Sequence, residues 1–263
     1  MKVRSRPPRF ARFSVLLLIT LVTLALFAGE AAAFLHRVGP INPAPSVGNF
    51  PAWYQDNTGI TLEFCDPKNA AEAAGAWCLV GTAEVPNPPE VFPGEFFDEH
   101  FYYSISADTN ALVNDFLWEA AVEAAFSVGA ATPGEQIVFT RIRIRIRNLT
   151  QNGTYRVIHP YGVHVLAFDN NAGNEDQIFF TEDVGVAAGV FTGALKSKLG
   201  PFLLPADTPG GTELPPVSSP PGPVPGKQYI ADPGRSGPVT GSPYDNNFVR
   251  VEGPANAFGT GGS

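Results

Sequence analysis

Four arginines alternate with three isoleucines from Arg141 to Arg147, and this alternation constrains the fold more than any other feature of the chain. Successive side chains of a β-strand point to opposite faces, so the isoleucines share one face with Val138 and the arginines share the other. The isoleucine face therefore belongs in a hydrophobic core. The arginine face has to be solvated or paired, because burying an unpaired charge costs too much.

The segment 116–127 offers carboxylates to this arginine face. We expect it to pair antiparallel with 137–147, with Glu123 opposite Arg141 and Glu119 opposite Arg145. Opposite charges across two strands contribute about 0.2–1 kcal/mol per pair. The alternative is a site for a polyanion or an acidic glycan. We favour the paired and solvated face, which also discourages edge-to-edge association of sheets.

Several other stretches show the same period of two. Residues 116–127 contain Ala and Glu, which favour a helix, but their large apolar positions alternate and so predict a strand. In residues 99–107, the pattern places Phe101, Tyr103 and Ile105 on one side. Turn-forming Gly (27) and Pro (26) separate such stretches. About ten to twelve short strands predict an all-β fold, a two-sheet sandwich of Greek-key or jelly-roll type.

The first 33 residues differ from the rest. Five basic residues and no acidic residue occupy positions 1–12, and an uncharged apolar run follows up to a small-residue end at Ala31–Ala33. This pattern indicates a secretory signal peptide, with an uncleaved membrane anchor as the alternative. Cleavage after Ala33 leaves 12 basic and 24 acidic residues, a net charge of −12. We therefore expect a secreted or cell-surface protein that binds no nucleic acid and, after cleavage, inserts into no membrane.

Composition divides the exported part of the chain into three. An extended N-terminal arm is expected at 34–58, a β-sandwich domain at 59–254, and a flexible tail or the start of a linker at 255–263. Within the domain, residues 205–226 are rich in Pro and Gly, which predicts a mobile insertion on the surface.

Cys65 and Cys78 are the only two cysteines. In an oxidising compartment such a pair predicts one disulfide that closes a short loop. The spacing, with no histidine or further cysteine nearby, does not favour zinc. The loop would contribute about 3 kcal/mol to stability through its closure entropy.

Calcium is the one cofactor that the sequence suggests. The stretch 169–176 gathers oxygen donors that suit this ion, with Asp169, Asn171, Asn174 and Asp176 as the candidate ligands. The stretch does not follow the EF-hand pattern, and a plain polar turn is the alternative. His159 and His164 are separated by a proline turn, so we expect histidines that bond the backbone rather than a metal pair.

Motifs for catalysis are not found in the sequence. It contains no nucleophile elbow, P-loop, dinucleotide fingerprint or zinc-protease motif. Glu182, Asp183 and Asp232 could serve a glycoside hydrolase, but adjacent strand residues point apart, and we expect Asp183 to cap the following turn. Exposed aromatic rings could instead form a carbohydrate platform, for which the candidates are Trp53, Tyr54, Phe96, Phe97, Tyr102 and Trp118.

Five stretches together resemble an uncharacterised β-rich module of large secreted or surface-exposed bacterial proteins. They are RIRIRI, GTYRVIHPYGV, FTEDVG, FTGALKSKLGPFL and VTGSPYDNNFVRVEGP, and the resemblance covers about residues 39–254. In such proteins the module tends to precede Ig-like or other adhesive repeats. The resemblance implies no cofactor and no catalytic residue, and this chain departs from the pattern in its proline-rich insertion at 205–226.

These observations together predict a non-catalytic structural or adhesive module outside the cytoplasm. The alternative is a β-sandwich that binds carbohydrate or another ligand, with or without calcium, and a glycoside-type hydrolase ranks third. An extracellular glycan or a surface protein would be the partner. Exposed rings beside a groove would favour ligand binding, and a cleft with two facing carboxylates would favour hydrolysis.

Overall fold

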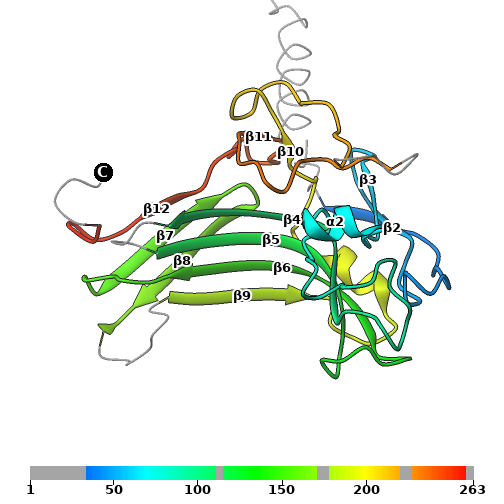
Figure 1. Ribbon diagram of the computed structural model, residues 1–263. Coiled ribbons are helices and arrows are strands. Elements are labelled where there is room, and N and C mark those ends of the chain that lie inside the picture. The colour runs from blue at the N-terminus through cyan, green and yellow to red at the C-terminus, as the bar shows by residue number, and fades with distance from the viewer. Residues whose placement is uncertain (1–33, 111–114, 171–177, 220–226, 259–263) are drawn as a thin grey trace, which may run out of the picture. The chain divides into compact units, whose positions relative to one another are not determined.

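The computed structural model describes residues 34–110, 115–170, 178–219 and 227–258. It is all-β, and the expected sandwich of two antiparallel sheets is confirmed (Figure 1). The first sheet has the strand order β4-β5-β6-β9. Its strands are β4 (Glu99–Asn110), β5 (Asp115–Phe126), β6 (Gln136–Ile146) and β9 (Ile178–Val184). The segment 116–127 is therefore a strand and not a helix.

The second sheet has the order β12-β7-β8. Its strands are β7 (Gly153–His159), β8 (Gly162–Phe168) and β12 (Arg250–Glu252), and β7 and β8 form a tight hairpin. The two sheets meet through aromatic rings. Trp118 of β5 packs on His159 with ring centroids 5.4 Å apart, and His164 of β8 packs on Phe180 of β9 at 4.4 Å.

The core between the sheets follows from the period of two. On β5 the alternating apolar residues from Trp118 to Ala124 are fully buried, and on β6 so are Ile144 and Ile146. Burying a side chain of the size of isoleucine contributes about 1.5–3 kcal/mol, so these two strands supply much of the hydrophobic stabilisation.

One side-chain orientation on β4 differs from the expected alternation. A bulge between Phe101 and Tyr103 shifts the pairing with β5, so that Phe101 lies opposite Glu123 and Tyr103 lies opposite Val122. Tyr102 and Tyr103 are both buried in the core as a result, whereas Phe101 belongs to the outward face. An extra residue in one strand changes which face the following side chains take.

The N-terminal segment 34–58 is part of the folded unit. It contributes β1 (Leu35–Val38) and β2 (Trp53–Asp56), which form a small sheet with β3 (Thr61–Glu63). Leu35, Phe50 and Tyr54 are fully buried in the same core as the sandwich. The segment is thus anchored in the core by these large side chains.

The remaining elements are short. They are the helix α2 (Ala70–Ala74), the 3-10 helix η2 (Phe191–Lys196), and the two-stranded pair β10 (Leu204–Pro205) and β11 (Val239–Thr240).

The described part of the proline-rich insertion packs against the fold near both of its ends, because Ala206 and Ser219 are buried. Ala257, within the segment 255–263, is also buried. Across the described ranges, no helix has the length and apolar character needed to span a membrane.

Candidate functional site

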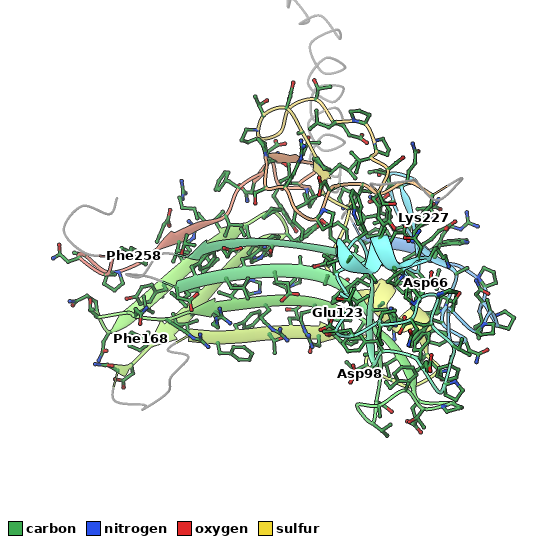
Figure 2. The ribbon with its side chains drawn as sticks, viewed as in Figure 1. Asp66, Asp98, Glu123, Phe168, Lys227 and Phe258 are labelled. Carbon is green, nitrogen blue, oxygen red and sulfur yellow. A yellow bond between two sulfur atoms is a disulfide. The ribbon has the colours of Figure 1, made fainter. Side chains whose placement is uncertain are left out.

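The outward face of β6 carries the arginines, and carboxylates of the neighbouring strands pair with them. Arg141 donates from Nη1 to Glu123 of β5 at 2.9 Å, and from Nε and Nη2 to the two oxygens of Asp183 on β9, both at 2.9 Å. Figure 2 labels Glu123 on the first sheet. Its guanidinium also lies 4.9 Å from the centre of the Phe139 ring. A guanidinium that binds a carboxylate through two nitrogens is held in a defined orientation.

The register between β5 and β6 differs from the expected one. Glu119 lies opposite Arg143, with Nη1 and Oε2 3.6 Å apart, so the predicted pair of Glu119 with Arg145 is wrong. Glu123 lies opposite Phe139 and reaches Arg141 diagonally. The turn fixes this register through a hydrogen bond from Ser127 N to Glu135 O at 2.8 Å. Long side chains bridge diagonal positions, which is why the pair of Glu123 with Arg141 forms all the same.

Asp115 completes the charged face at its other end. Its two oxygens lie 3.4 Å from Arg145 Nη2 and 3.3 Å from Arg147 Nη1. Burial alone would raise the pKa of Asp183, but hydrogen bonds from Arg141 and Thr181 and the charge of Arg141 lower it. Burial raises the pKa of Glu123 despite the charge of Arg141. All four arginines thus lie within 3.6 Å of a carboxylate, as expected of a paired face.

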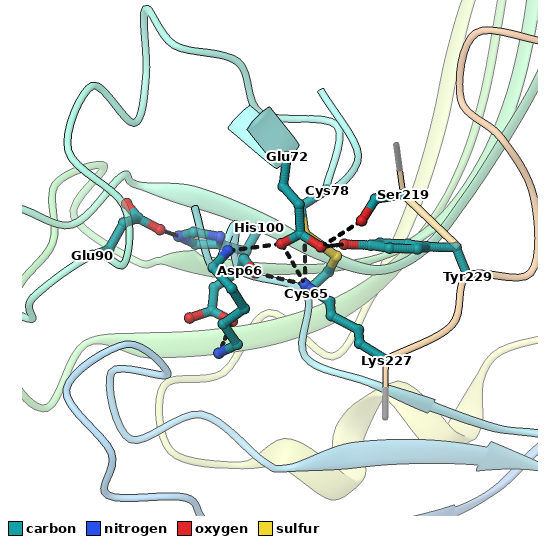
Figure 3. Close-up of a disulfide and its surroundings, with 10 residues drawn as sticks. Cys65, Asp66, Glu72, Cys78, Glu90, His100, Ser219, Lys227 and Tyr229 are labelled. Atoms are coloured by element: carbon teal, nitrogen blue, oxygen red, sulfur yellow. Dashed lines mark hydrogen bonds and ion pairs between the residues drawn. A yellow bond between two sulfur atoms is a disulfide. The ribbon is translucent and has the colours of Figure 1, made fainter. Parts of the chain in front are cut away.

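The disulfide between Cys65 and Cys78 is formed, and it closes the loop that contains α2. This helix begins because the side chain of Asn69 accepts hydrogen bonds from Ala71 N and Glu72 N. The cap fixes the first turn of α2, and the side chain of Glu72 points inward and is 1% exposed. Figure 3 shows its carboxylate beside the disulfide, facing residues from a distant part of the chain.

Four donors surround the Glu72 carboxylate. Oε1 accepts from Tyr229 at 2.7 Å and from Ser219 at 3.0 Å, while Oε2 accepts from Lys68 N at 2.8 Å and from Lys227 at 3.2 Å. Burial alone would raise the pKa of Glu72, but the hydrogen bonds from Lys68, Tyr229 and Lys227 and the charge of Lys227 lower it. The group is thus an ionised, fully bonded carboxylate that joins the disulfide loop to residues on both sides of 220–226.

A pocket lies between the loop before β4 and the turn after β5. It has a volume of about 490 Å³ and is lined by Glu84, Glu90, Glu95, Asp98, Phe96 and Phe97. Ala130 and Ala131 form part of its wall, from the turn that joins β5 to β6. Phe96 and Phe97 are two of the residues that the sequence suggested for a carbohydrate platform. The acidic residues could not be predicted, because nothing in the sequence brings the two loops together.

Glu90 lies at the inner wall of this pocket and is 3% exposed. Its Oε1 accepts a hydrogen bond from Phe97 N at 2.5 Å, and its Oε2 lies 3.1 Å from Nε2 of His100 without the alignment of a hydrogen bond. Burial raises the pKa of Glu90 to about 7 and lowers the pKa of His100 to about 4. Glu90 therefore ties the pocket loop to β4, with both oxygens turned toward the protein.

His159 and His164 meet across the β7–β8 hairpin, although the proline turn between them did not predict such a pair. His159 Nε2 and His164 Nδ1 are 2.9 Å apart, and the two rings are nearly parallel. His159 Nδ1 accepts a hydrogen bond from Tyr161 N at 3.2 Å, so its proton is on Nε2 and is donated to His164. The two rings thus form a hydrogen-bonded pair that joins β7 to β8.

The structure describes only some of the other residues proposed from sequence. Asp169 accepts a hydrogen bond from Asn152 at 3.1 Å, while Asn171, Asn174 and Asp176 lie outside the described residues. Asp183 pairs with Arg141 instead of capping a turn. In the described ranges, no three metal-ligating side chains are grouped to hold one ion.

The aromatic residues proposed for a sugar platform do not share one surface. Tyr54, Tyr102 and Trp118 are buried in the core. Trp53 is half-buried on β2, and Phe96 and Phe97 are half-buried at the pocket. The pocket and the charged face are two surfaces of the described residues at which a partner could bind. No family model, no curated protein and no solved structure matches this chain.

Proposed function

We propose that this chain is a non-catalytic structural or adhesive module of a secreted or cell-surface protein. The observation that carries the proposal is the charged face of the first sheet. Its arginines contact carboxylates on both neighbouring strands, so these charges join β5, β6 and β9. Such a face suits a domain that has to keep its shape in an extracellular environment.

Export is supported by three features. The disulfide of Cys65 with Cys78 forms and persists in oxidising compartments. The first 33 residues have the composition of a secretory signal, and the rest of the chain is strongly acidic. The resemblance to surface modules of bacteria agrees with this location. Fractionation of cells that express the full chain should place the processed protein outside the cytoplasm, and uncleaved protein in the cytoplasm would contradict the proposal.

Ligand binding is the second candidate function, and the pocket is the observation that favours it. Its volume of about 490 Å³ lies within the range of small-molecule sites, and it combines carboxylates with two phenyl rings. Carboxylates accept hydrogen bonds from sugar hydroxyls, and rings pack on sugar faces. Glu90 is not available for this, because its oxygens face Phe97 and His100.

A binding survey separates the two functions. The purified protein would be applied to a glycan array and to immobilised surface proteins, with and without calcium. An adhesive module is expected to bind a surface protein, and a structural one to bind neither panel while retaining its fold. Glycan binding that is lost in Glu95→Gln would establish the second function in place of the first. Turnover of a glycoside that is lost in the same variant would contradict both.

A further inference from the structure

The strand β8 is a free edge of the second sheet. It pairs with β7 along all seven of its residues, and no other described strand pairs with it. In an antiparallel pair, every second residue of an edge strand directs its N–H and C=O groups away from the neighbouring strand. These groups of β8 are therefore open to a further strand, whose extended backbone offers the matching donors and acceptors.

This edge lacks the features that usually prevent strand pairing. Its sequence, GVHVLAF, contains no Asp, Glu, Lys, Arg or Pro, and its pairing with β7 shows no bulge. Charges and bulges are the devices that protect sheet edges. The other outer strands of the two sheets all carry charges, which are Asp108 on β4, Glu182 and Asp183 on β9, and Arg250 and Glu252 on β12. Among these four described edges, β8 is thus the unprotected one.

The outward side chains of β8 are a second, independent observation. Val163 and Val165 are 43% and 66% exposed, and Ala167 is exposed beside them. An antiparallel sheet with one solvated face usually turns polar side chains outward, as β7 does with Thr154 and Arg156. The outward strip of β8 is apolar instead, so it gains from contact with another protein surface.

We propose that β8 pairs antiparallel with β8 of a second copy of this chain, about a two-fold axis at Val165. In this register Val165 lies opposite Val165 of the second copy, and Val163 lies opposite Ala167. Gly162 lies opposite Phe168, whose ring can cover a glycine on an edge strand. The two second sheets then form one continuous sheet with the order β12-β7-β8-β8-β7-β12.

Charge favours a second copy as the occupant. A two-fold axis brings one patch onto itself, so the patch has to be free of like charges that would meet. Burial lowers the pKa of His164, the one titratable residue of β8, so its ring is neutral near pH 7. On β7, Arg156 lies opposite Val165 and is paired with Glu252 at 3.0 Å. The two strips therefore meet without unpaired like charges.

Sedimentation equilibrium of the purified protein tests the proposal. We expect a monomer–dimer equilibrium with a dissociation constant below about 1 mM. Val165→Lys places two like charges at the axis and should weaken the dimer about tenfold or more. Val186→Lys, at a valine that is 54% exposed in the loop after β9, is the matched control and should leave the dimer unchanged. Unfolding temperatures of both variants check that the fold is intact.

Single cysteines test the register. Val165→Cys brings two cysteines to facing positions with Cβ atoms about 4.5–5.5 Å apart, so mild oxidation should link the two copies. Val163→Cys leaves its two cysteines four residues apart along the strands, which is about 13 Å, so they should not link. Combining Val163→Cys with Ala167→Cys should restore the link between copies.

Three results would overturn the inference. One is a wild type that stays monomeric up to about 1 mM, including a monomer whose β8 edge binds a strand of another protein. Another is a dimer that Val165→Lys leaves intact, which would place the contact between copies elsewhere. The third is equal linking of Val163→Cys and Val165→Cys, which would exclude pairing about Val165.

Discussion

Arg141 and Asp183 form a bidentate ion pair across β6 and β9, with both nitrogen–oxygen distances at 2.9 Å. The same guanidinium holds Glu123 of β5 through its third nitrogen. One side chain therefore joins three adjacent strands on the outward face. Asp183 is about a quarter exposed and Arg141 less, so solvent screens this pair less than a typical surface ion pair.

The register of β5 against β6 gives the first prediction. Glu119→Lys places like charges opposite each other at Arg143 and should lower the free energy of unfolding by about 0.5–1 kcal/mol. Adding Arg143→Glu should restore most of the loss, whereas adding Arg145→Glu should not. Chemical denaturation of the single and double variants measures both effects. Rescue by Arg145→Glu instead would mean that the strands pair two residues away from the register described.

The Glu72 cluster gives the second prediction. Glu72→Gln removes the charge that faces Lys227 and should lower the free energy of unfolding by about 2 kcal/mol at neutral pH. Because the pKa of Glu72 is lowered in the folded state, its stabilisation is present above the unfolded carboxyl pKa and lost as pH falls through the folded one. The difference between wild type and variant should therefore shrink in acid. Glu63→Gln, at an exposed carboxylate on β3, is the control, and an equal loss in both variants would refute the role of the cluster.

Glu90 gives a prediction of opposite sign. Its pKa of about 7 is raised by burial, so the folded state binds a proton that the unfolded state has released. The stabilisation by Glu90 is thus fully present below the unfolded carboxyl pKa. It is lost as pH rises through 7, and the free energy of unfolding falls by about 3 kcal/mol in all.

His100 has the reverse dependence, because its pKa of about 4 lies below the ordinary histidine value. Its contribution to stability is present above that ordinary value and is lost as pH falls toward 4.

The variant Glu90→Gln separates the contribution of Glu90 from that of His100. The free energies of unfolding of this variant and of the wild type would be measured from pH 5 to 8 and compared. The variant should gain stability relative to wild type as pH rises, and parallel curves would show that Glu90 ionises normally.

The disulfide gives a prediction about the loop that it closes. The double variant Cys65→Ala, Cys78→Ala should lower the free energy of unfolding by about 3 kcal/mol, since the unfolded chain regains the freedom of the loop. A reducing agent should produce a similar loss in the wild type and none in the variant. A wild type that unfolds identically with and without reductant would indicate that the bond is not formed in solution.

Sequence alone predicted the sandwich because its strands follow a strict period of two. That pattern fixes which face each side chain takes, as at Trp118 and Ile144, and so it identified the core. It cannot fix the register, because a slip of two residues leaves every side chain on its own face. The error at Glu119 has this cause, since only the turn at Ser127–Glu135 decides between the two pairings.

The buried polar groups could not be predicted for a different reason. Glu72 and Lys227 are 155 residues apart, and no local pattern relates them. His159 and His164 are close in sequence, but their contact depends on a hairpin in which His164 lies opposite Val157. The pocket likewise needs the loop before β4 and the turn after β5 to lie together, which is a consequence of packing.

A double-mutant cycle on Arg141 and Asp183 tests most directly whether the charged face serves the fold. The unfolding free energies of Arg141→Met, Asp183→Asn and the double variant would be measured together with retention on a heparin column. We predict a coupling of about 1 kcal/mol and weak retention that the variants do not change. The absence of coupling, together with strong retention that Arg141→Met abolishes, would show that these arginines serve a polyanion instead.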